Sequence, residues 1–139
     1  MNKTLVVFAS KQEFNAVFPQ ISAVVAASTP VSVGALYDVT ACGVGLLDYA
    51  VNLSYILRQY HYERVFALGI CGAYLNRDLN LCDVVRVDSE VVGDMGVQDR
   101  DGHFATWGEV TGEPVIYKGD SPRVLPFGLA SLPSVVGVS

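Results

Sequence analysis

Two glycine-rich turns and one carboxylate are the parts of this chain best suited to chemistry. The sequence GVG at residues 43–45 follows an apolar segment and precedes a helical pattern, and GICG at residues 69–72 follows a second apolar segment. Glycines at such places let the backbone approach a ligand, and a helix start adds the positive end of a dipole. Glu13 lies just past the first apolar segment, where a carboxylate can orient a water molecule or accept its proton.

Each of these features has a structural alternative. Residues 43–45 also suit a tight turn from strand to helix, and the third glycine of a dinucleotide fingerprint is replaced by Asp48. Glu13 taken alone also fits a solvated acid on a helix face. The sequence GDSPR at residues 119–123 suggests a phosphate clamp, but its Pro and Gly content and the lack of a preceding strand favour a simple turn.

The apolar pattern predicts alternating strands and helices in the first half, with Ser10 as a helix N-cap. Strands are expected at residues 4–9, 36–41 and 65–68, with weaker candidates at 24–26 and 31–33, and helices at 11–18 and 46–60. This alternation is typical of an α/β sandwich, and two glycine turns after two strands can open at one carboxyl edge of the sheet.

The second half predicts more strand and turn, which indicates a mixed sheet. A strand is expected at residues 82–87, with 91–96 continuing or leaving it, and the polar stretch 100–123 indicates loops with a hairpin around 115–117. Residues 132–139 resemble a loop that enters a buried strand, which predicts a chain cut within a domain. The alternative is an ordinary edge strand at the terminus. The length of the chain predicts a single domain over residues 1–139.

Composition excludes several classes of protein. The chain has 139 residues, of which 51% are hydrophobic and 17% charged, so we expect burial of apolar surface in an oligomer or a larger protein. The net charge of −5 argues against binding to nucleic acid. Residues 14–37 carry no charge, but their prolines, glycine and small polar residues argue against a membrane span.

The cysteines and histidines indicate a cytoplasmic protein without a metal site. Cys42, Cys71 and Cys82 lie in apolar surroundings, which predicts reduced and buried thiols. His61 and His103 are far apart, and no metal-ligand spacing is present. No signal peptide is expected at the N-terminus, because the first apolar run is short and Lys11 follows it.

The order of these segments resembles the nucleoside phosphorylase and nucleosidase superfamily, which includes purine nucleoside phosphorylases and methylthioadenosine nucleosidases. The likeness covers nearly the whole chain: the first strand leading to Glu13, the two glycine turns, DVV at residues 83–85, and SE at 89–90 with Asp94. The segment SEVVGDMGV at residues 89–97, followed by Asp101-Gly102, most resembles futalosine hydrolase of menaquinone biosynthesis.

The resemblance implies a three-layer α/β/α sandwich around a central mixed sheet, and a homodimer or higher homo-oligomer. It implies cleavage of the N-ribosidic bond of a small-molecule nucleoside without a cofactor or metal. Glu13 matches the glutamate that orients or activates the attacking water. The residues matched to the substrate-binding pocket are Ser10, Val44, Ile70, Cys71 and Gly72.

Two departures from the family pattern refine this expectation. Ile70 occupies the position where phosphorylases carry a hydroxyl residue, which favours water over phosphate. The family's base-binding aspartate and ribose-binding glutamate, from its C-terminal third, are not matched, which predicts the N-terminal two-thirds of a nucleosidase with weak or no activity. The alternatives are a purine or uridine phosphorylase, and a non-catalytic α/β interaction module.

Overall fold

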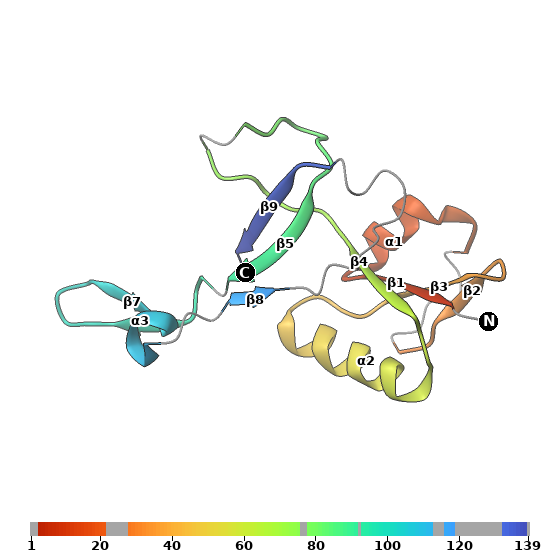
Figure 1. Ribbon diagram of the computed structural model, residues 1–139, viewed down its shortest axis with the longest axis horizontal. Coiled ribbons are helices and arrows are strands. Elements are labelled where there is room, and N and C mark those ends of the chain that lie inside the picture. Colours follow the sequence, from red (N-terminus) through yellow and green to blue (C-terminus); the bar gives the residue numbers. More distant parts are fainter. Residues whose placement is uncertain are drawn as a thin grey trace. The chain divides into compact units, whose positions relative to one another are not determined.

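The computed structural model describes residues 3–21, 28–75, 78–91, 93–112, 116–118 and 132–138. The chain divides into two compact units, Met1–Tyr74 and Leu75–Ser139, which are described one at a time. Figure 1 shows the elements of both units, coloured along the sequence from red at the N-terminus to blue at the C-terminus.

The first unit is built on a four-stranded mixed sheet with the strand order β2-β3-β1-β4. Strand β1 lies between β3 and β4 and is parallel to both, whereas β2 pairs antiparallel with β3. A strand with parallel neighbours on both sides and helices on both faces is apolar throughout, which explains the uninterrupted TLVVF of β1. The elements of this unit are β1 (Thr4–Phe8), α1 (Lys11–Val17), the 3₁₀ helix η1 (Pro19–Ile21), β2 (Val31–Val33), β3 (Tyr37–Ala41), α2 (Leu46–Gln59) and β4 (Arg64–Leu68).

Helices α1 and α2 pack on opposite faces of this sheet (Figure 1). Phe14 of α1 belongs to one buried cluster with Phe8, and Ile56 of α2 belongs to a second cluster with Val7. Successive residues of β1 alternate between the two clusters, as the pleat of a strand requires. Phe14 and Ile56 are fully buried, and each such side chain contributes about 1.5–3 kcal/mol.

Strand β4 forms an edge of the sheet in the described residues. It pairs with β1 along its whole length, yet it is far more exposed than β1. Val65 and Leu68 are exposed by 41% and 46%. The core of the first unit therefore centres on β1 and β3.

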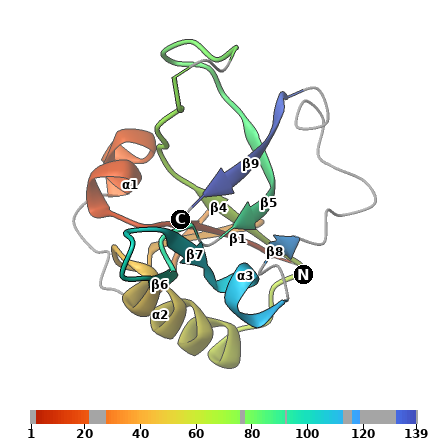
Figure 2. The same cartoon turned by 90° about the vertical axis from the view of Figure 1, so that its left-hand side faces the viewer.

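The second unit contains a three-stranded sheet and a separate hairpin. Strand β5 pairs antiparallel with β8 and parallel with β9, and β6 forms a hairpin with β7. Figure 2 shows β9 beside β5 and helix α3 directly after β7. None of the side chains described in this unit is buried. Its elements are β5 (Arg86–Val91), β6 (Gly96–Gln98), β7 (Phe104–Thr106), α3 (Trp107–Thr111), β8 (Ile116–Lys118) and β9 (Ser134–Val138).

The sequence predictions were accurate for the element bounds of the first unit and poor for the second. The expectation that the strand at residues 65–68 is buried is wrong, because β4 is an exposed edge strand in the described residues. The strand expected at residues 82–87 begins only at Arg86, because Cys82 lies in a turn with a φ of 73°. The hairpin expected around residues 115–117 is wrong, since β8 pairs with the distant β5. The expectation of loops for residues 100–123 missed β7 and α3.

The strand expected near residue 132 is present as β9, but it is not buried. Val136 is exposed by 60%, so the apolar composition of this segment did not predict its burial. The weak strand candidate at residues 24–26 lies outside the described residues, whereas the candidate at residues 31–33 is confirmed as β2.

Candidate functional site

The two glycine turns and the start of α1 leave the first sheet at the same edge. Phe8, near the end of β1, pairs with Ala41 of β3 on one side and with Leu68 of β4 on the other. Because these three strands are parallel, the segments that follow them meet at one carboxyl edge. This confirms the predicted placement of the two turns. Such an edge is where open α/β sheets bind ligands.

Glu13 connects two of the three segments at this edge. Its Oε2 accepts hydrogen bonds from the backbone N and from Oγ of Ser10, both at 2.8 Å. Its Oε1 accepts a hydrogen bond from the backbone N of Ile70 at 3.0 Å. In return Ser10 Oγ accepts the backbone N–H of Glu13, which completes a capping box at the start of α1. Glu13 is therefore anchored by hydrogen bonds on both oxygens, and the capping box accounts for its position with or without a catalytic role.

These contacts keep Glu13 ionised. The hydrogen bond from Ile70 lowers the pKa of Glu13 most, partial burial raises it, and the hydrogen bonds from Ser10 lower it further, so the net pKa lies below its ordinary value of 4.5. A carboxylate with a lowered pKa is a weak base. It is therefore better suited to orienting a water molecule than to removing a proton from it.

The phenol of Tyr49 and the thiol of Cys42 remain neutral at ordinary pH. Burial raises the pKa of Tyr49 to about 12, with further contributions from Cys42 and the charge of Glu13. Burial also raises the pKa of the Cys42 thiol. Tyr49, whose pKa responds to the charge of Glu13, was not among the residues singled out from the sequence. Its position in the first turns after the GVG motif was the signal available in the sequence.

Gly69 allows the contact between Glu13 and the turn after β4. A Cβ atom at residue 69 would lie 3.1 Å from Glu13 Oε1, which is tighter than ordinary van der Waals contact. The glycine therefore has a packing role at this position. The turn itself is open, because Ile70 is exposed by 89% and Cys71 and Gly72 are also exposed.

The GVG turn is explained largely by structure. Gly43 and Gly45 have φ angles of 111° and 93°, a region that favours glycine. The side chain of Asn52 in α2 donates a hydrogen bond to the carbonyl of Cys42 at 2.7 Å and so holds the turn against the helix. Val44 is exposed by 71%. These features fit a tight turn from strand to helix, and the exposure of Val44 also fits contact with a ligand.

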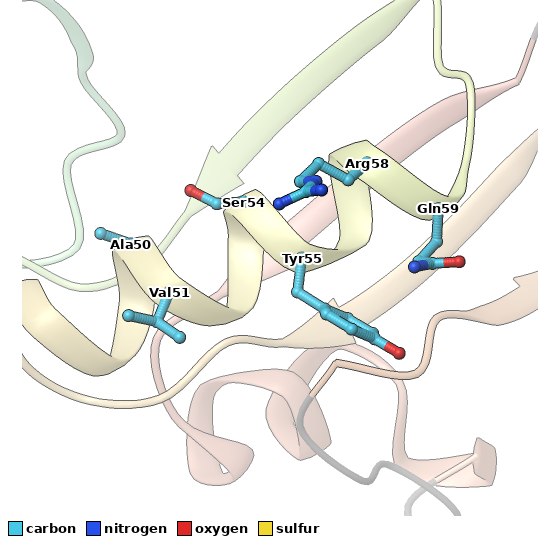
Figure 3. A pocket seen from close by; sticks show the side chains of 6 residues that line it. All are labelled: Ala50, Val51, Ser54, Tyr55, Arg58 and Gln59. Carbon is cyan, nitrogen blue, oxygen red and sulfur yellow. The ribbon is translucent and has the colours of Figure 1, made fainter.

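A shallow concave surface lies elsewhere, along α2, and includes none of the predicted site residues. Figure 3 shows the side chains that line it: Ala50, Val51, Ser54, Tyr55, Arg58 and Gln59. Aliphatic, aromatic and polar groups are mixed on this surface. It does not coincide with the carboxyl edge.

Asp38 forms a second buried polar arrangement, near the amino-terminal end of β3. It accepts hydrogen bonds from Lys3 Nζ at 2.7 Å, from Ser32 Oγ at 2.7 Å and from Tyr62 OH at 3.0 Å. Burial raises the pKa of Asp38, but these hydrogen bonds more than compensate, so the pKa is lowered. A lone acid inside an apolar strand was the sequence signal for this buried group.

The three cysteines do not form a further reactive centre with one another. Cys42, Cys71 and Cys82 are free thiols, but only Cys42 is buried, so the expectation of burial is wrong for the other two. No group of three or more His, Cys, Asp or Glu residues suited to a metal occurs in the described parts of the chain. Within the same parts, no helix has the length and apolar character needed to cross a membrane.

No family model matches this chain, and no curated protein or solved structure is significantly similar to it.

Proposed function

We propose that this protein is a nucleosidase that hydrolyses the N-ribosidic bond of a purine nucleoside. The observation that supports this most is the ionised carboxylate of Glu13, held by Ser10 and Ile70 at the carboxyl edge of three parallel strands. The likeness of residues 89–97 to futalosine hydrolase makes futalosine-like nucleosides of menaquinone biosynthesis the proposed substrate class.

In the proposed reaction Glu13 orients a water molecule toward the anomeric carbon of the ribose. The bond from the water oxygen to that carbon forms while the carbon–nitrogen bond to the purine breaks and its electron pair stays on the base. One water proton remains on the new sugar hydroxyl, and the other leaves to solvent while the base takes a proton from solvent. The negative charge of Glu13 also stabilises the positive charge that develops on the sugar.

The contacts of Glu13 support water as the nucleophile over phosphate. The backbone N–H of Ile70, which could donate to a phosphate oxygen, is already paired with Glu13. Phosphate near this turn would also meet the negative charge of that carboxylate, and Ile70 offers no hydroxyl. These features disfavour the alternative of a purine or uridine phosphorylase.

The test measures purine release by chromatography over long incubations, with and without phosphate. We expect slow release that does not depend on phosphate, because no residue of this chain is matched to a proton donor for the base. Glu13→Gln should reduce the rate by about 100-fold or more. Glu109→Gln, which alters a capping box in the second unit, is the matched control and should leave the rate unchanged. A requirement for phosphate would exclude the hydrolase.

The proposal also includes a three-layer α/β/α arrangement and a cytoplasmic location. The packing of α1 and α2 on opposite faces of the first sheet supports the layered fold. The free state of the three cysteines supports the reducing compartment.

A non-catalytic interaction module is the second candidate, and the outer face of α2 favours it. Leu47, Val51 and Tyr55 follow one another at intervals of four residues and are exposed. Such a stripe on a helix is typical of a surface that binds another protein. The same stripe supports the expected homodimer or higher homo-oligomer. Light scattering should show a dimer or larger species, and Val51→Glu should yield a monomer.

A further inference from the structure

The two oxygens of Glu13 are held in different ways. Oε2 accepts two hydrogen bonds, from the backbone N and the Oγ of Ser10. Oε1 accepts one, from the backbone N of Ile70. A carboxylate offers roughly two acceptor positions on each oxygen. Oε2 is thus saturated by Ser10, and Oε1 keeps one position for a further donor.

The backbone around Glu13 Oε1 restricts the movement of this oxygen, and so fixes the direction of its free acceptor position. Oε1 is fixed by the Ile70 N–H on the turn after β4, and Gly69 lies close enough that a Cβ there would be 3.1 Å away. Because Oε2 is held at the same time by Ser10, both oxygens of the Glu13 carboxylate are fixed and the group cannot rotate freely.

We infer that Ser10 is a positioning residue for the proposed hydrolysis: it fixes Oε2 of Glu13 so that Oε1 orients the attacking water. This inference rests on the proposed function. It adds to the prediction that Ser10 lies in the substrate pocket, because here Ser10 acts through Glu13.

A second capping box in the chain shows what Ser10 would do if it were only a helix cap. Glu109 Oε2 accepts hydrogen bonds from the backbone N of Thr106 at 2.7 Å and from Thr106 Oγ1 at 2.9 Å, nearly the geometry of Ser10 and Glu13. Among the hydrogen bonds of the described residues, Glu109 has no counterpart of the contact with Ile70. Thr106→Ala therefore removes a cap of the same kind without touching the carboxyl edge.

The experiment combines a structural and a kinetic readout on the full chain. The titration of the Glu13 side-chain carboxyl carbon is followed by NMR in the wild type, Ser10→Ala, Ser10→Thr and Thr106→Ala. Purine release from a nucleoside is measured across the same pH range, at a temperature where circular dichroism shows each variant folded.

We expect Ser10→Ala to raise the pKa of Glu13, to slow purine release by about 10-fold, and to move the acid limb of the rate profile to higher pH. Ser10→Thr, which keeps the hydroxyl, should restore most of the rate. Thr106→Ala should change neither readout.

Three outcomes would overturn the inference or its basis. An unchanged Glu13 pKa in Ser10→Ala would show that Ser10 does not hold the carboxylate. If Ser10→Ala slows purine release but leaves the acid limb of the pH–rate profile unchanged, Ser10 acts only as a helix cap. Absence of purine release by the wild type would reject the hydrolase proposal and the catalytic use of this arrangement, while the NMR titration would still decide whether Ser10 fixes Glu13.

Discussion

Helices α1 and α3 begin with the same local device in very different surroundings. Each has a hydroxyl residue at the N-cap and a glutamate three residues later, and in each the glutamate carboxylate accepts hydrogen bonds from the backbone N and the hydroxyl of the N-cap residue. In α1 the glutamate also accepts a hydrogen bond from Ile70, 57 residues further along the chain. In α3 Thr106 is half-buried and Glu109 is exposed, and the glutamate is bonded only to its own cap among the described hydrogen bonds.

The same Ser/Thr-x-x-Glu pattern can therefore form a purely local cap or take part in a tertiary contact. In α3 it only starts a helix of five residues. In α1 the second oxygen of the glutamate is free to join the helix to a turn on another strand. The sheet topology that brings β4 next to β1 converts a helix cap into a tertiary contact.

The largest expected difference between the two helices concerns their packing. Phe14 of α1 is fully buried in an aromatic cluster, with its ring centroid 5.8 Å from that of Phe8. Phe14→Ala should therefore lower the free energy of unfolding by about 3–5 kcal/mol. Val110 of α3 is 49% exposed, and Val110→Ala should cost less than about 0.5 kcal/mol. Urea unfolding followed by circular dichroism compares the two, and equal losses would show that α1 is not anchored as described.

Removal of each glutamate tests the capping boxes directly. Glu13→Ala removes the partner of the Ile70 N–H and the reciprocal bonds of the α1 cap, and should cost about 0.5–2 kcal/mol, since water can replace part of these exposed contacts. Glu109→Ala exposes its partners to water and should cost clearly less. The same unfolding experiment measures both. Similar losses would mean that the contact with Ile70 adds no stability.

The pH dependence of stability should follow the charge on Glu13. Because the pKa of Glu13 is lowered on folding, its contribution is present above the ordinary carboxyl value of 4.5 and is lost as the pH falls through the lower folded pKa. Wild-type stability should therefore decline below about pH 4.5 more steeply than that of Glu13→Gln. Thermal unfolding at pH 3 to 7 measures this slope, and parallel curves would contradict the described ionisation.

The smallest expected effect distinguishes two glycines of one turn. An alanine at residue 69 would place its Cβ 3.1 Å from Glu13 Oε1, so Gly69→Ala should be destabilising by about 1 kcal/mol or less. An added Cβ at Gly72 meets no atom within 4 Å, and Gly72→Ala should be neutral or slightly stabilising. A calorimetric difference in Tm between these variants checks the prediction, and the reverse order would contradict it.

The sequence predicted the first unit well because its signals are local. The uninterrupted apolar run of β1, the helical spacing of α2 and the cap at Ser10 each specify an element, and their bounds agree with the structure to within about two residues. The shared carboxyl edge followed from the general geometry of parallel strands. The hydrogen bond from Ile70 to Glu13 could not be predicted, because it depends on the strand order.

The second unit was harder to predict because its strands are specified by their partners. Strand β5 pairs with β9, more than forty residues away, and carries Arg86, Asp88 and Glu90 in place of an apolar run. Helix α3 has five residues, too few to show a period. With no described side chain buried, there was no core pattern to detect.

The exposure of β4 has a consequence for how the first sheet can grow. Among the described residues no strand pairs with the outer side of β4, so its outer backbone N–H and C=O groups form a row with which another strand can pair, and Val65 and Leu68 are exposed apolar residues of the same strand. At the opposite edge β2 has only three residues, which gives a visiting strand little to pair with. Extension of the sheet, by another segment or by another molecule, is therefore directional and favours the side that carries the Ile70 turn.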